Sequence, residues 1–331
     1  MATTVNAAFS QFLRESVNID STVSKTARAS RDWLVNQINA IPARDRLFPA
    51  LNENIHIHYG SFARRTKIRE LDDLDMIIGL KGLGITYLEV DGAIQLTVPK
   101  DHPMEALCYD DSSILNSRRV INQFVKQLQN VPQYSRAEIK RNGAAAVLNL
   151  TSYPWCFDVV PGFITSAEAD GRDYYVIPNG GGHWMKTDPR IDQERVSQIN
   201  QWCDGNVLQP LRLMKYWNRR GTMPSMPSYL LECMVLQYYY SHISASQFSD
   251  VEFGVLVAHF ISAIFQVVPD PKYIQGDLNS VAMSDRVAIS ERATLDAERA
   301  RQARHFESQS DHRSSIAKWG EIFGPAFPRF G

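Results

Sequence analysis

The sequence lacks the marks of an extracellular or membrane-inserted protein. None of its four cysteines forms a CxxC pair, so neither a disulfide framework nor a zinc ribbon is indicated. Three of them lie in apolar runs, which predicts reduced thiols in a core. The four are Cys108, Cys156, Cys203 and Cys233. No apolar run of signal-peptide length opens the chain, and no stretch of about 18 apolar residues occurs in it. We therefore expect a soluble, cytoplasmic protein that inserts in no membrane.

A strong excess of either charge is also absent. Lys and Arg total 35 against 36 Asp and Glu among 331 residues, which gives a formal net charge of −1. A protein that coats nucleic acid would be expected to carry a basic excess. The chain has no internal repeat and no low-complexity tract. Its length is enough for a large core and suits two lobes better than one.

A turn suited to phosphate binding follows the first expected strand. Residues 54–58 predict a strand, and Gly60-Ser61 interrupts it where a helix can begin. The first backbone N–H groups of a helix have no partner within the helix. Together with the Ser61 hydroxyl they would face an incoming phosphate.

A pair of carboxylates follows on a second apolar strand. Asp73 and Asp75 are two apart in the expected strand 73–80, so both side chains lie on one face while its apolar residues are buried. Two carboxylates on one face can reach the same pair of hard cations. Two such ions stabilise the attacking and the leaving oxygen of phosphoryl transfer. The segment therefore predicts nucleotide chemistry with metal ions.

This chemistry calls for a third carboxylate on a neighbouring strand, and Asp158 fits that requirement. It is the lone acid of an apolar, β-prone run, residues 155–160, which Pro161-Gly162 is expected to end. There it would hold the second metal and activate the attacking hydroxyl. A DxD pair alone is common in solvated loops. The Gly-Ser turn upstream and the third acid downstream favour a catalytic site.

Other polar residues have plainer interpretations. His56 and His58 alternate like metal ligands, but no cysteine or further histidine lies at ligand spacing, so packed or surface histidines are favoured. Arg64, Arg65, Lys67 and Arg69 could meet phosphates, and a solvated charged face is the alternative for Lys67 and Arg69. Residues 291–304, rich in Arg, Glu and Ala, predict a solvent-exposed helix with i,i+4 pairs. Lys215 lies beside an apolar helix face and could extend toward a triphosphate, with a surface lysine as the alternative.

The acids and the Gly-Ser turn together resemble the polymerase-β-like nucleotidyltransferases, whose pattern is Gly-Ser, an acid-x-acid pair and a third acid on a later strand. Residues 211–217 and 227–232 resemble the helical-lobe motifs of the branch that contains oligoadenylate synthase, cyclic GMP-AMP synthase and the bacterial CD-NTases. Trp184 and Asp188-Pro189 also resemble the bacterial members. The resemblance covers residues 20 to 271 or so. It implies an α+β fold, with a mixed-sheet catalytic lobe, a helical second lobe and a long spine helix joining them.

The same resemblance implies roles for individual residues. In that branch the lysine and serine of the helical motifs contact the donor triphosphate, and the following tyrosine stacks on its base. The matching positions are Lys215, Ser228 and Tyr229. The resemblance also implies two Mg²⁺ ions, for which Mn²⁺ can substitute, held by the acids at 73, 75 and 158.

The implied function is the synthesis of a cyclic di- or trinucleotide second messenger from NTPs, with ATP among them. In bacterial anti-phage systems of the CBASS type, such a product activates a separate effector. The chain has no long basic insertion and no zinc-ligand cluster like that of the animal DNA sensor, so direct activation by double-stranded DNA is not expected.

The alternative is a template-independent RNA nucleotidyltransferase, such as a poly(A) or CCA-adding enzyme or a linear oligonucleotide synthase. The neutral charge balance counts against it. A catalytically dead binding module is disfavoured because all three acids are present.

Periodicity and turn residues predict the remaining organisation. Residues 1–178 are expected to form the catalytic lobe, with the long helix from about residue 20 to 41. Residues 179–331 are expected to form the helical lobe and its tail. The glycine run 179–182 is expected to be a hinge between the lobes or a loop over the nucleotide. Further strands are expected at 93–98 and 144–150, and helices at 112–128, 189–202, 207–220, 228–241, 250–268 and 285–306.

The tail is expected to be extended and accessible, even if Trp319 and Phe323 anchor it. Two prolines and two glycines in the last eight residues forbid a helix to the end. Some bacterial CD-NTases resemble substrates of a partner that looks like fused ubiquitin-activating and ubiquitin-conjugating enzymes. That resemblance implies conjugation at Gly331, with an ordinary disordered end as the alternative.

Overall fold

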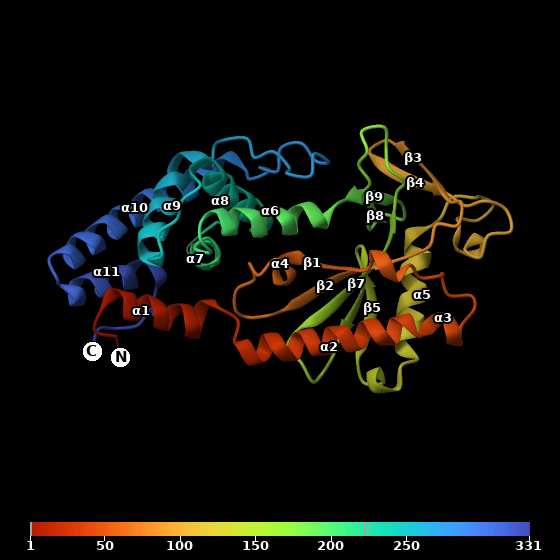
Figure 1. The fold of residues 1–331 in the computed structure, drawn as a ribbon, viewed down its shortest axis with the longest axis horizontal. Helices are drawn as coiled ribbons and strands as arrows, with labels where there is room; N and C mark the ends of the chain where they lie inside the picture. Colours follow the sequence, from red (N-terminus) through yellow and green to blue (C-terminus); the bar gives the residue numbers. More distant parts are fainter. Residues whose placement is uncertain (1, 222, 225) are drawn as a thin grey trace. The chain divides into compact units, whose positions relative to one another are not determined.

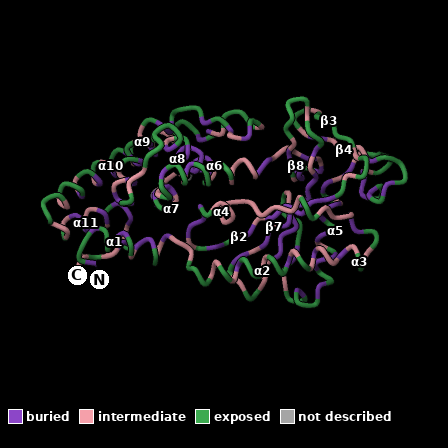
Figure 2. The backbone as a smooth tube through the Cα atoms, viewed as in Figure 1, coloured by how far each residue is buried: buried purple, intermediate pink, exposed green. Residues whose placement is uncertain are grey.

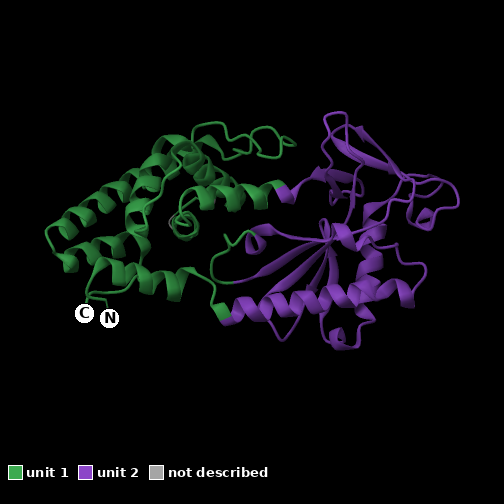
Figure 3. Ribbon diagram, viewed as in Figure 1, with its two compact units in different colours: residues 1–21, 64–70, 191–331 green, residues 22–63, 71–190 purple. Residues whose placement is uncertain are grey.

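The computed structural model describes residues 2–221, 223, 224 and 226–331 and divides the chain into two compact units. Unit 1 comprises residues 1–21, 64–70 and 191–331, and unit 2 comprises residues 22–63 and 71–190 (Figure 3). The chain therefore passes from one unit to the other after residues 21, 63, 70 and 190. The sequence predicts two lobes that meet after residue 178. That division into lobes stays a prediction.

Unit 2 is built on one mixed sheet of nine strands. Their bounds are β1 Ile57–Tyr59, β2 Asp73–Gly79, β3 Thr86–Val90, β4 Ala93–Thr97, β5 Glu138–Asn142, β6 Ala145–Asn149, β7 Cys156–Ile164, β8 Tyr175–Pro178 and β9 Trp184–Thr187. The main order is β1-β2-β7-β8-β9-β4-β3, and the β5–β6 hairpin pairs with β7 through β6. The pair β2–β7 is parallel and the other pairs are antiparallel.

The middle of this sheet is its most buried part. Along β2 and β7 the first residues alternate between half-buried and buried, and the later residues are almost all buried (Figure 2). Strands covered on both faces are expected to be rich in apolar residues, as these are. The half-buried positions at the start of each strand thus share one face, and the three acids occupy three of them.

Two hairpins complete the sheet, β3–β4 and β5–β6. The sequence pattern predicts only the second strand of each. Strands β3 and β4 are joined by Asp91 and Gly92, whose φ angles are 51° and 74°. Asp-Gly with two positive φ angles is the favoured two-residue hairpin turn. Strands β5 and β6 turn at Gly143, whose φ is 54°. The turn signals were therefore present in the sequence.

Strand β7 is longer than expected, and the prediction that Pro161-Gly162 ends it is wrong. The pairing of β6 with β7 stops at Val159, and that of β8 begins at Phe163. Pro161 lies between these two pairings, so on that side its missing N–H removes no ladder hydrogen bond. The strand therefore runs through it to Ile164.

The helices of unit 2 also differ in detail from expectation. The long helix α2, Ser21–Asn39, ends two residues early and is followed by α3, Ile41–Arg44. Helix α5, Ser117–Gln129, begins later than the predicted residue 112, because the Asn116 side chain caps it by accepting a hydrogen bond from Arg118 N. Figure 1 shows both long helices beside the sheet, and α5 packs on β5, β6 and β7.

The predicted strand 54–58 is shorter and begins later. Residues Glu53–Ile55 form a 3₁₀ turn, and only Ile57–Tyr59 pair with β2. The short helix α4, Gly60–Ala63, follows directly. The glycine run 179–182 is the loop of the β8–β9 hairpin, in which Asn179 N donates to His183 O, so it links two strands of one unit.

Unit 1 is helical. Its helices are α1 Val5–Phe12, a π-helical turn Leu13–Val17, α6 Pro189–Trp202 from its third residue, α7 Leu208–Asn218, α8 Ser228–His242, α9 Ser249–Ala263, α10 Met283–Ser308 and α11 His312–Phe323. The predicted helix 189–202 has these bounds, and the other four expected helices differ by a few residues at their ends. Helix α9 packs on α7 and α10, and α11 packs on α10 and α1. Helix α11 was not expected.

An aromatic cluster ties the two ends of the chain together within unit 1. The Phe9 ring meets the rings of Trp319, Phe323 and Phe327 edge-on at 5.0 to 5.8 Å. Residues Ala2 and Phe330 form a parallel β-bridge, and Gly331 N donates to Ala2 O at 3.3 Å. The tail is therefore docked by the buried Phe327 and the half-buried Phe330, while Pro325, Ala326, Arg329 and Gly331 are exposed.

Among the described helices, none combines the length and the apolar character that crossing a bilayer requires.

Candidate active site

The predicted acids lie together at the beginning of two neighbouring strands of unit 2, β2 and β7. In the parallel pair β2–β7, Asp75 is the direct partner of Asp158, and Asp73 is the partner of Cys156. Directly paired residues of neighbouring strands point to the same face, as do residues two apart in one strand. Asp73, Asp75 and Asp158 therefore share a face, and each is half-buried. Three carboxylates can reach one ligand there while the strand residues between them stay in the core.

The Gly-Ser turn is packed against this carboxylate face. Tyr59, at the end of β1, pairs with Asp75, so the next residue, Gly60, lies over the Asp75 side chain. A Cβ atom built on Gly60 would lie 1.8 Å from Asp75 Oδ2, and the φ of Gly60 is +74°. Only glycine satisfies both constraints without displacing the carboxylate. Ser61 follows as the second residue of α4, and this short helix packs on β2, the strand that carries Asp73 and Asp75.

Negative charge accumulates at this face. Burial raises the pKa of the Tyr59 hydroxyl, and the carboxylates of Asp75, Asp158 and Asp73 raise it further. Burial, and to a lesser extent the negative charges of Asp158 and Asp73, raise the pKa of the Cys156 thiol to about 12. Its Sγ lies 3.7 Å from Asp158 Oδ1 and donates to it, so the thiol stays protonated and is no nucleophile.

The donor set suits hard divalent cations. Carboxylate oxygens are the ligands that Mg²⁺ prefers, and Mg²⁺ is commonly held by one or two carboxylates together with substrate phosphates. Throughout residues 2–221, 223, 224 and 226–331, no group of three or more His, Cys, Asp or Glu side chains is gathered tightly enough to hold a metal unaided. The three acids match Mg²⁺ in donor chemistry, and oxygens from outside this set, such as those of substrate phosphates, would have to complete its ligands.

The histidines on β1 and beside it are packing residues, as predicted. His56 Nδ1 accepts a hydrogen bond from Gly79 N at 3.0 Å, and its Nε2 meets Asn39 Oδ1 at 3.0 Å. Burial lowers the pKa of His56, and burial with the nearby Arg31 lowers that of His58 to about 4. Both rings are therefore neutral near pH 7.

The residues predicted to contact the nucleotide from the helical motifs lie in unit 1. Lys215, on α7, is 5% exposed, so the alternative of a surface lysine is wrong. Its Nζ donates to Glu232 Oε2 at 2.6 Å and to Thr66 Oγ1 at 3.2 Å. Ser228 is the exposed first residue of α8. Glu232 is the last residue of the motif 227–232, and the motif alone predicts no role for it.

Tyr229 has a more elaborate environment than a lone stacking ring. Its hydroxyl donates to Asp192 Oδ1 at 2.6 Å and accepts a hydrogen bond from Lys272 Nζ. The Lys272 ammonium lies 4.3 Å and the Arg64 guanidinium 5.6 Å from the ring centroid. The ring is thus held in place, and a base that stacked on it would share it with two cations.

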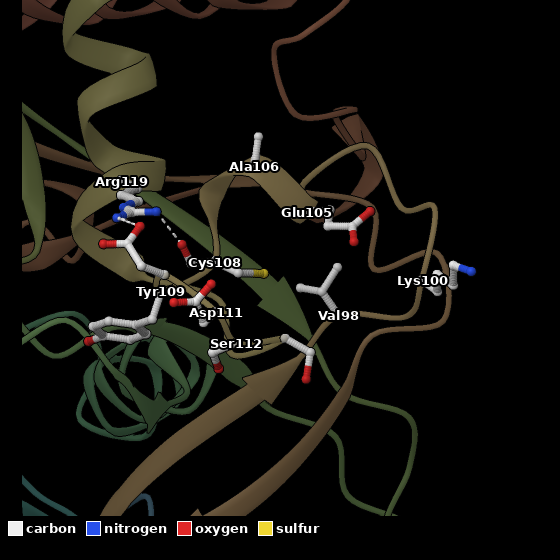
Figure 4. A pocket seen from close by; sticks show the side chains of 11 residues that line it. Val98, Lys100, Glu105, Ala106, Cys108, Tyr109, Asp111, Ser112 and Arg119 are labelled. Carbon is white, nitrogen blue, oxygen red and sulfur yellow. Dashed lines mark hydrogen bonds and ion pairs between the residues drawn. The ribbon is translucent and has the colours of Figure 1, made fainter.

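A separate hollow in unit 2 does not involve the acids. It measures about 630 Å³, and the part of the chain that the structure describes lines it with Val98, Lys100 and residues between Glu105 and Arg119 (Figure 4). Arg119 donates to Asp110 Oδ1 at 2.7 Å and to Cys108 O, so its guanidinium fixes the loop 108–113. Because none of the three acids lines this hollow, we assign the candidate active site to the carboxylate face.

Comparison with known proteins places the chain in a family. No protein-family model matches it. A probable cyclic nucleotide synthase of Bacillus cereus strain VD146 is 41% identical over 329 residues, 99% of each chain. A cyclic AMP-AMP-AMP synthase of an Acinetobacter strain is 25% identical over 185 residues, 52% of this chain and 50% of that protein.

Solved structures share the fold. Escherichia coli MS115-1 CdnC, solved with ATP, has a TM-score of 0.69 at 15% identity, with 98% of each chain covered. Escherichia coli DncV, solved with 3′-deoxy GTP, has a TM-score of 0.63 at 15% identity, over 96% of this chain and 97% of that one. These two confirm the expected polymerase-β-like α+β fold with a helical region. With the full-length relative, they show that the chain belongs to the CD-NTase family of cyclic nucleotide synthases and is a nucleotidyltransferase that makes cyclic oligonucleotides.

Proposed function

We propose that this enzyme makes a cyclic di- or trinucleotide second messenger for anti-phage defence, with Mg²⁺ as cofactor and pyrophosphate as the leaving product. The observation that supports this most is the register of β2 and β7, which sets the three acids on one face. ATP is among the proposed substrates, since CdnC was solved with ATP. A cytoplasmic location and a separate effector that binds the product belong to the same proposal.

The proposed reaction assigns a task to each acid. Mg²⁺ held by Asp73, Asp75 and Asp158 with triphosphate oxygens would neutralise charge at the reacting phosphate. Asp158 accepts the proton of a ribose 2′ or 3′ hydroxyl. That oxygen bonds to the α-phosphorus as the bond to the β-phosphate oxygen breaks, and pyrophosphate leaves. A second round on the linear intermediate closes the ring.

The family resemblance assigns five residues of the sequence to the donor NTP. Gly60 and Ser61 would meet its phosphates through backbone N–H groups and the serine hydroxyl. Lys215 and Ser228 would contact the triphosphate, and Tyr229 would stack on the base.

Product analysis tests the proposal. The purified protein is incubated with each of the four radiolabelled NTPs and with Mg²⁺ or Mn²⁺, and the products are treated with phosphatase and linkage-specific nucleases. A phosphatase-resistant product that a nuclease opens supports cyclic synthesis. A ladder of phosphatase-sensitive linear products would favour the template-independent RNA nucleotidyltransferase instead, and no incorporation would contradict both.

Alanine at position 60 should inactivate the enzyme. Its Cβ would overlap Asp75 Oδ2, so the carboxylate must move, and a misplacement of about 1 Å in a catalytic group can cost about 100-fold in rate. The measurement is kcat for NTP incorporation. Gly92→Ala is the matched control, because Gly92 has the same φ of +74° with nothing within 4 Å of the added Cβ. It should cost about 1–2 kcal/mol of stability and leave kcat unchanged. Equal rates for both variants would contradict the packing argument.

Removing the Tyr229 ring should weaken donor binding. Loss of base stacking is worth about 1–3 kcal/mol, so Tyr229→Ala should raise the KM for NTPs by about 5- to 150-fold. Tyr229→Phe keeps the ring but loses the hydrogen bonds to Asp192 and Lys272, and its KM should stay close to the original value. Initial rates over a range of NTP concentrations decide this. An unchanged KM in Tyr229→Ala would leave the ring a packing residue.

We also propose that Gly331 is conjugated through its carboxylate by a ubiquitin-activating and ubiquitin-conjugating type of partner. The bridge between Ala2 and Phe330 would have to open first. Mass spectrometry of the protein expressed with its neighbouring operon genes should detect an isopeptide bond to Gly331. Gly331→Glu should remove both the bond and phage protection, whereas Gln309→Glu, at another exposed position, should remove neither. The idea is dropped if no such bond forms and Gly331→Glu still protects.

A further inference from the structure

A buried ion network in unit 1 centres on Glu232 of α8. Its carboxylate is 1% exposed and accepts three hydrogen bonds from two different segments. Oε1 accepts from Arg64 Nε at 2.5 Å, and Oε2 accepts from Thr66 Oγ1 at 2.7 Å and from Lys215 Nζ at 2.6 Å. The Arg64 and Lys215 side chains are themselves only 8% and 5% exposed. One carboxylate therefore holds two nearly buried cations.

The network fixes a segment that lies between the two parts of the catalytic motif in sequence. Residues 64–70 follow Ser61 and precede Asp73, yet they belong to unit 1. Two further contacts fasten this segment: Arg212 Nε donates to Arg65 O, and Arg69 N donates to Val17 O, each at 2.9 Å. Those contacts use backbone carbonyls. Glu232 contacts the segment through its carboxylate, at Arg64 and Thr66, and it contacts Lys215 as well.

The same carboxylate also reaches the second proposed nucleotide contact in this unit. Arg64, bound to Glu232 through Nε, has its guanidinium 5.6 Å from the centroid of the Tyr229 ring. Glu232 thus touches Lys215 directly and Tyr229 through Arg64. Removing one partner of a buried ion pair leaves the other charge uncompensated, so both cations depend on this carboxylate for their position and for charge compensation.

Protonation of Lys215 is sensitive to this arrangement. Burial lowers the pKa of Lys215, Glu232 raises it, and Arg64 and Lys67 from segment 64–70 lower it further. For Glu232, burial raises the pKa, but Lys215 and Arg64 outweigh burial and the net direction is downward. The carboxylate is therefore ionised near pH 7, and it is the group that keeps Lys215 a cation.

We propose that Glu232 is a positioning residue for donor binding: its hydrogen bonds hold Lys215 oriented toward the triphosphate and Arg64 over the Tyr229 ring. This rests on the proposed function, in which Lys215 and Tyr229 contact the donor NTP. Glu232 itself touches no substrate atom. A structural role alone would lower stability without changing how donor binding responds to pH.

Glu232→Gln keeps the shape of the side chain and removes its charge. At pH 7.5 the KM for the NTP whose label enters the product should rise at least about tenfold, with kcat little changed, as expected when a charge-assisted contact is lost from ground-state binding. With less support for its charge, Lys215 loses its proton at lower pH. The KM of the variant should therefore climb as the pH is raised from about 6.5 to 9, while that of the parent stays flat.

Asp296→Asn is the matched control. Asp296 is also a fully buried acid of unit 1, and it accepts hydrogen bonds from Arg292, Arg299 and Trp217. Its substitution, like that of Glu232, should lower the thermal midpoint, but it should leave KM and its pH profile unchanged. A KM that climbs with pH in this variant as well would make the effect a general one and overturn the inference.

Lys215→Met separates the inference from the proposed function. In that background Glu232→Gln should raise KM by less than it does alone, because only its contact with Arg64 remains to be lost. If Lys215→Met alone leaves KM unchanged, the proposed donor site fails. If Lys215→Met raises KM while Glu232→Gln keeps the original KM and pH profile, or if the two effects simply multiply, the role of Glu232 is overturned.

Should Glu232→Gln not fold, Glu232→Asp replaces it. Its carboxylate is withdrawn by one methylene, so an original KM at every pH would overturn the inference equally.

Discussion

A protein carrying Asp73→Asn and Asp75→Asn together is expected to fold and to make no nucleotide product. The two asparagines keep the shape of the side chains but remove two of the three negative charges on the carboxylate face. Metal-assisted charge stabilisation contributes several kcal/mol to phosphoryl transfer, so the rate should fall by about 1,000-fold or more. Incorporation of α-labelled NTPs measures the rate, and thermal unfolding measures the fold.

Two comparisons make this result specific. The thermal midpoint should not fall. Like charges on neighbouring positions of a sheet repel, so their removal lowers the electrostatic repulsion between β2 and β7. Asp72→Asn is the control, since Asp72 precedes the pair and is exposed. It should leave the rate unchanged. Full activity in the double variant would refute the assignment of the acids.

Asp158→Asn should separate binding from transfer. Asp158 is the proposed proton acceptor, and loss of a general base costs about 100- to 10,000-fold in rate. Donor binding should survive, because Asp73 and Asp75 remain on the neighbouring strand. Binding of a non-hydrolysable ATP analogue measures the first property, and single-turnover transfer measures the second. An equal loss of both would make Asp158 a structural residue.

The strands that carry the acids could be predicted because their own residues alternate, but the pairing between them could not. Apolar and polar positions alternate from residue 73 onward, and the lone acid in 155–160 interrupts an apolar run. That Asp75 faces Asp158 depends on the parallel register of β2 and β7, whose strands lie about 80 residues apart in sequence. A local pattern contains no information about such a register.

Local sequence patterns also fail to show which residues of unit 1 are covered by neighbouring helices. The interpretation of residues 291–304 as a solvent-exposed helix is wrong for one face, because Asp296 is fully buried. Its carboxylate accepts from Arg292 and Arg299 on its own helix, which resembles a solvated ion pair, but also from Trp217 Nε1 at 2.9 Å. Likewise the partner of Lys215 lies on another helix. Charge patterns within one helix do not reveal which neighbour covers it.

The pairing of Ala2 with Phe330 has a practical consequence for anyone who modifies the chain. An affinity tag fused ahead of residue 2 would emerge beside residue 330 and could block an enzyme from reaching Gly331, so a negative conjugation result would be ambiguous. A tag inserted between Asp91 and Gly92 avoids this, because both residues are exposed at the tip of the β3–β4 hairpin. The same proximity would allow a short glycine linker to join the two ends, with new termini opened at that hairpin.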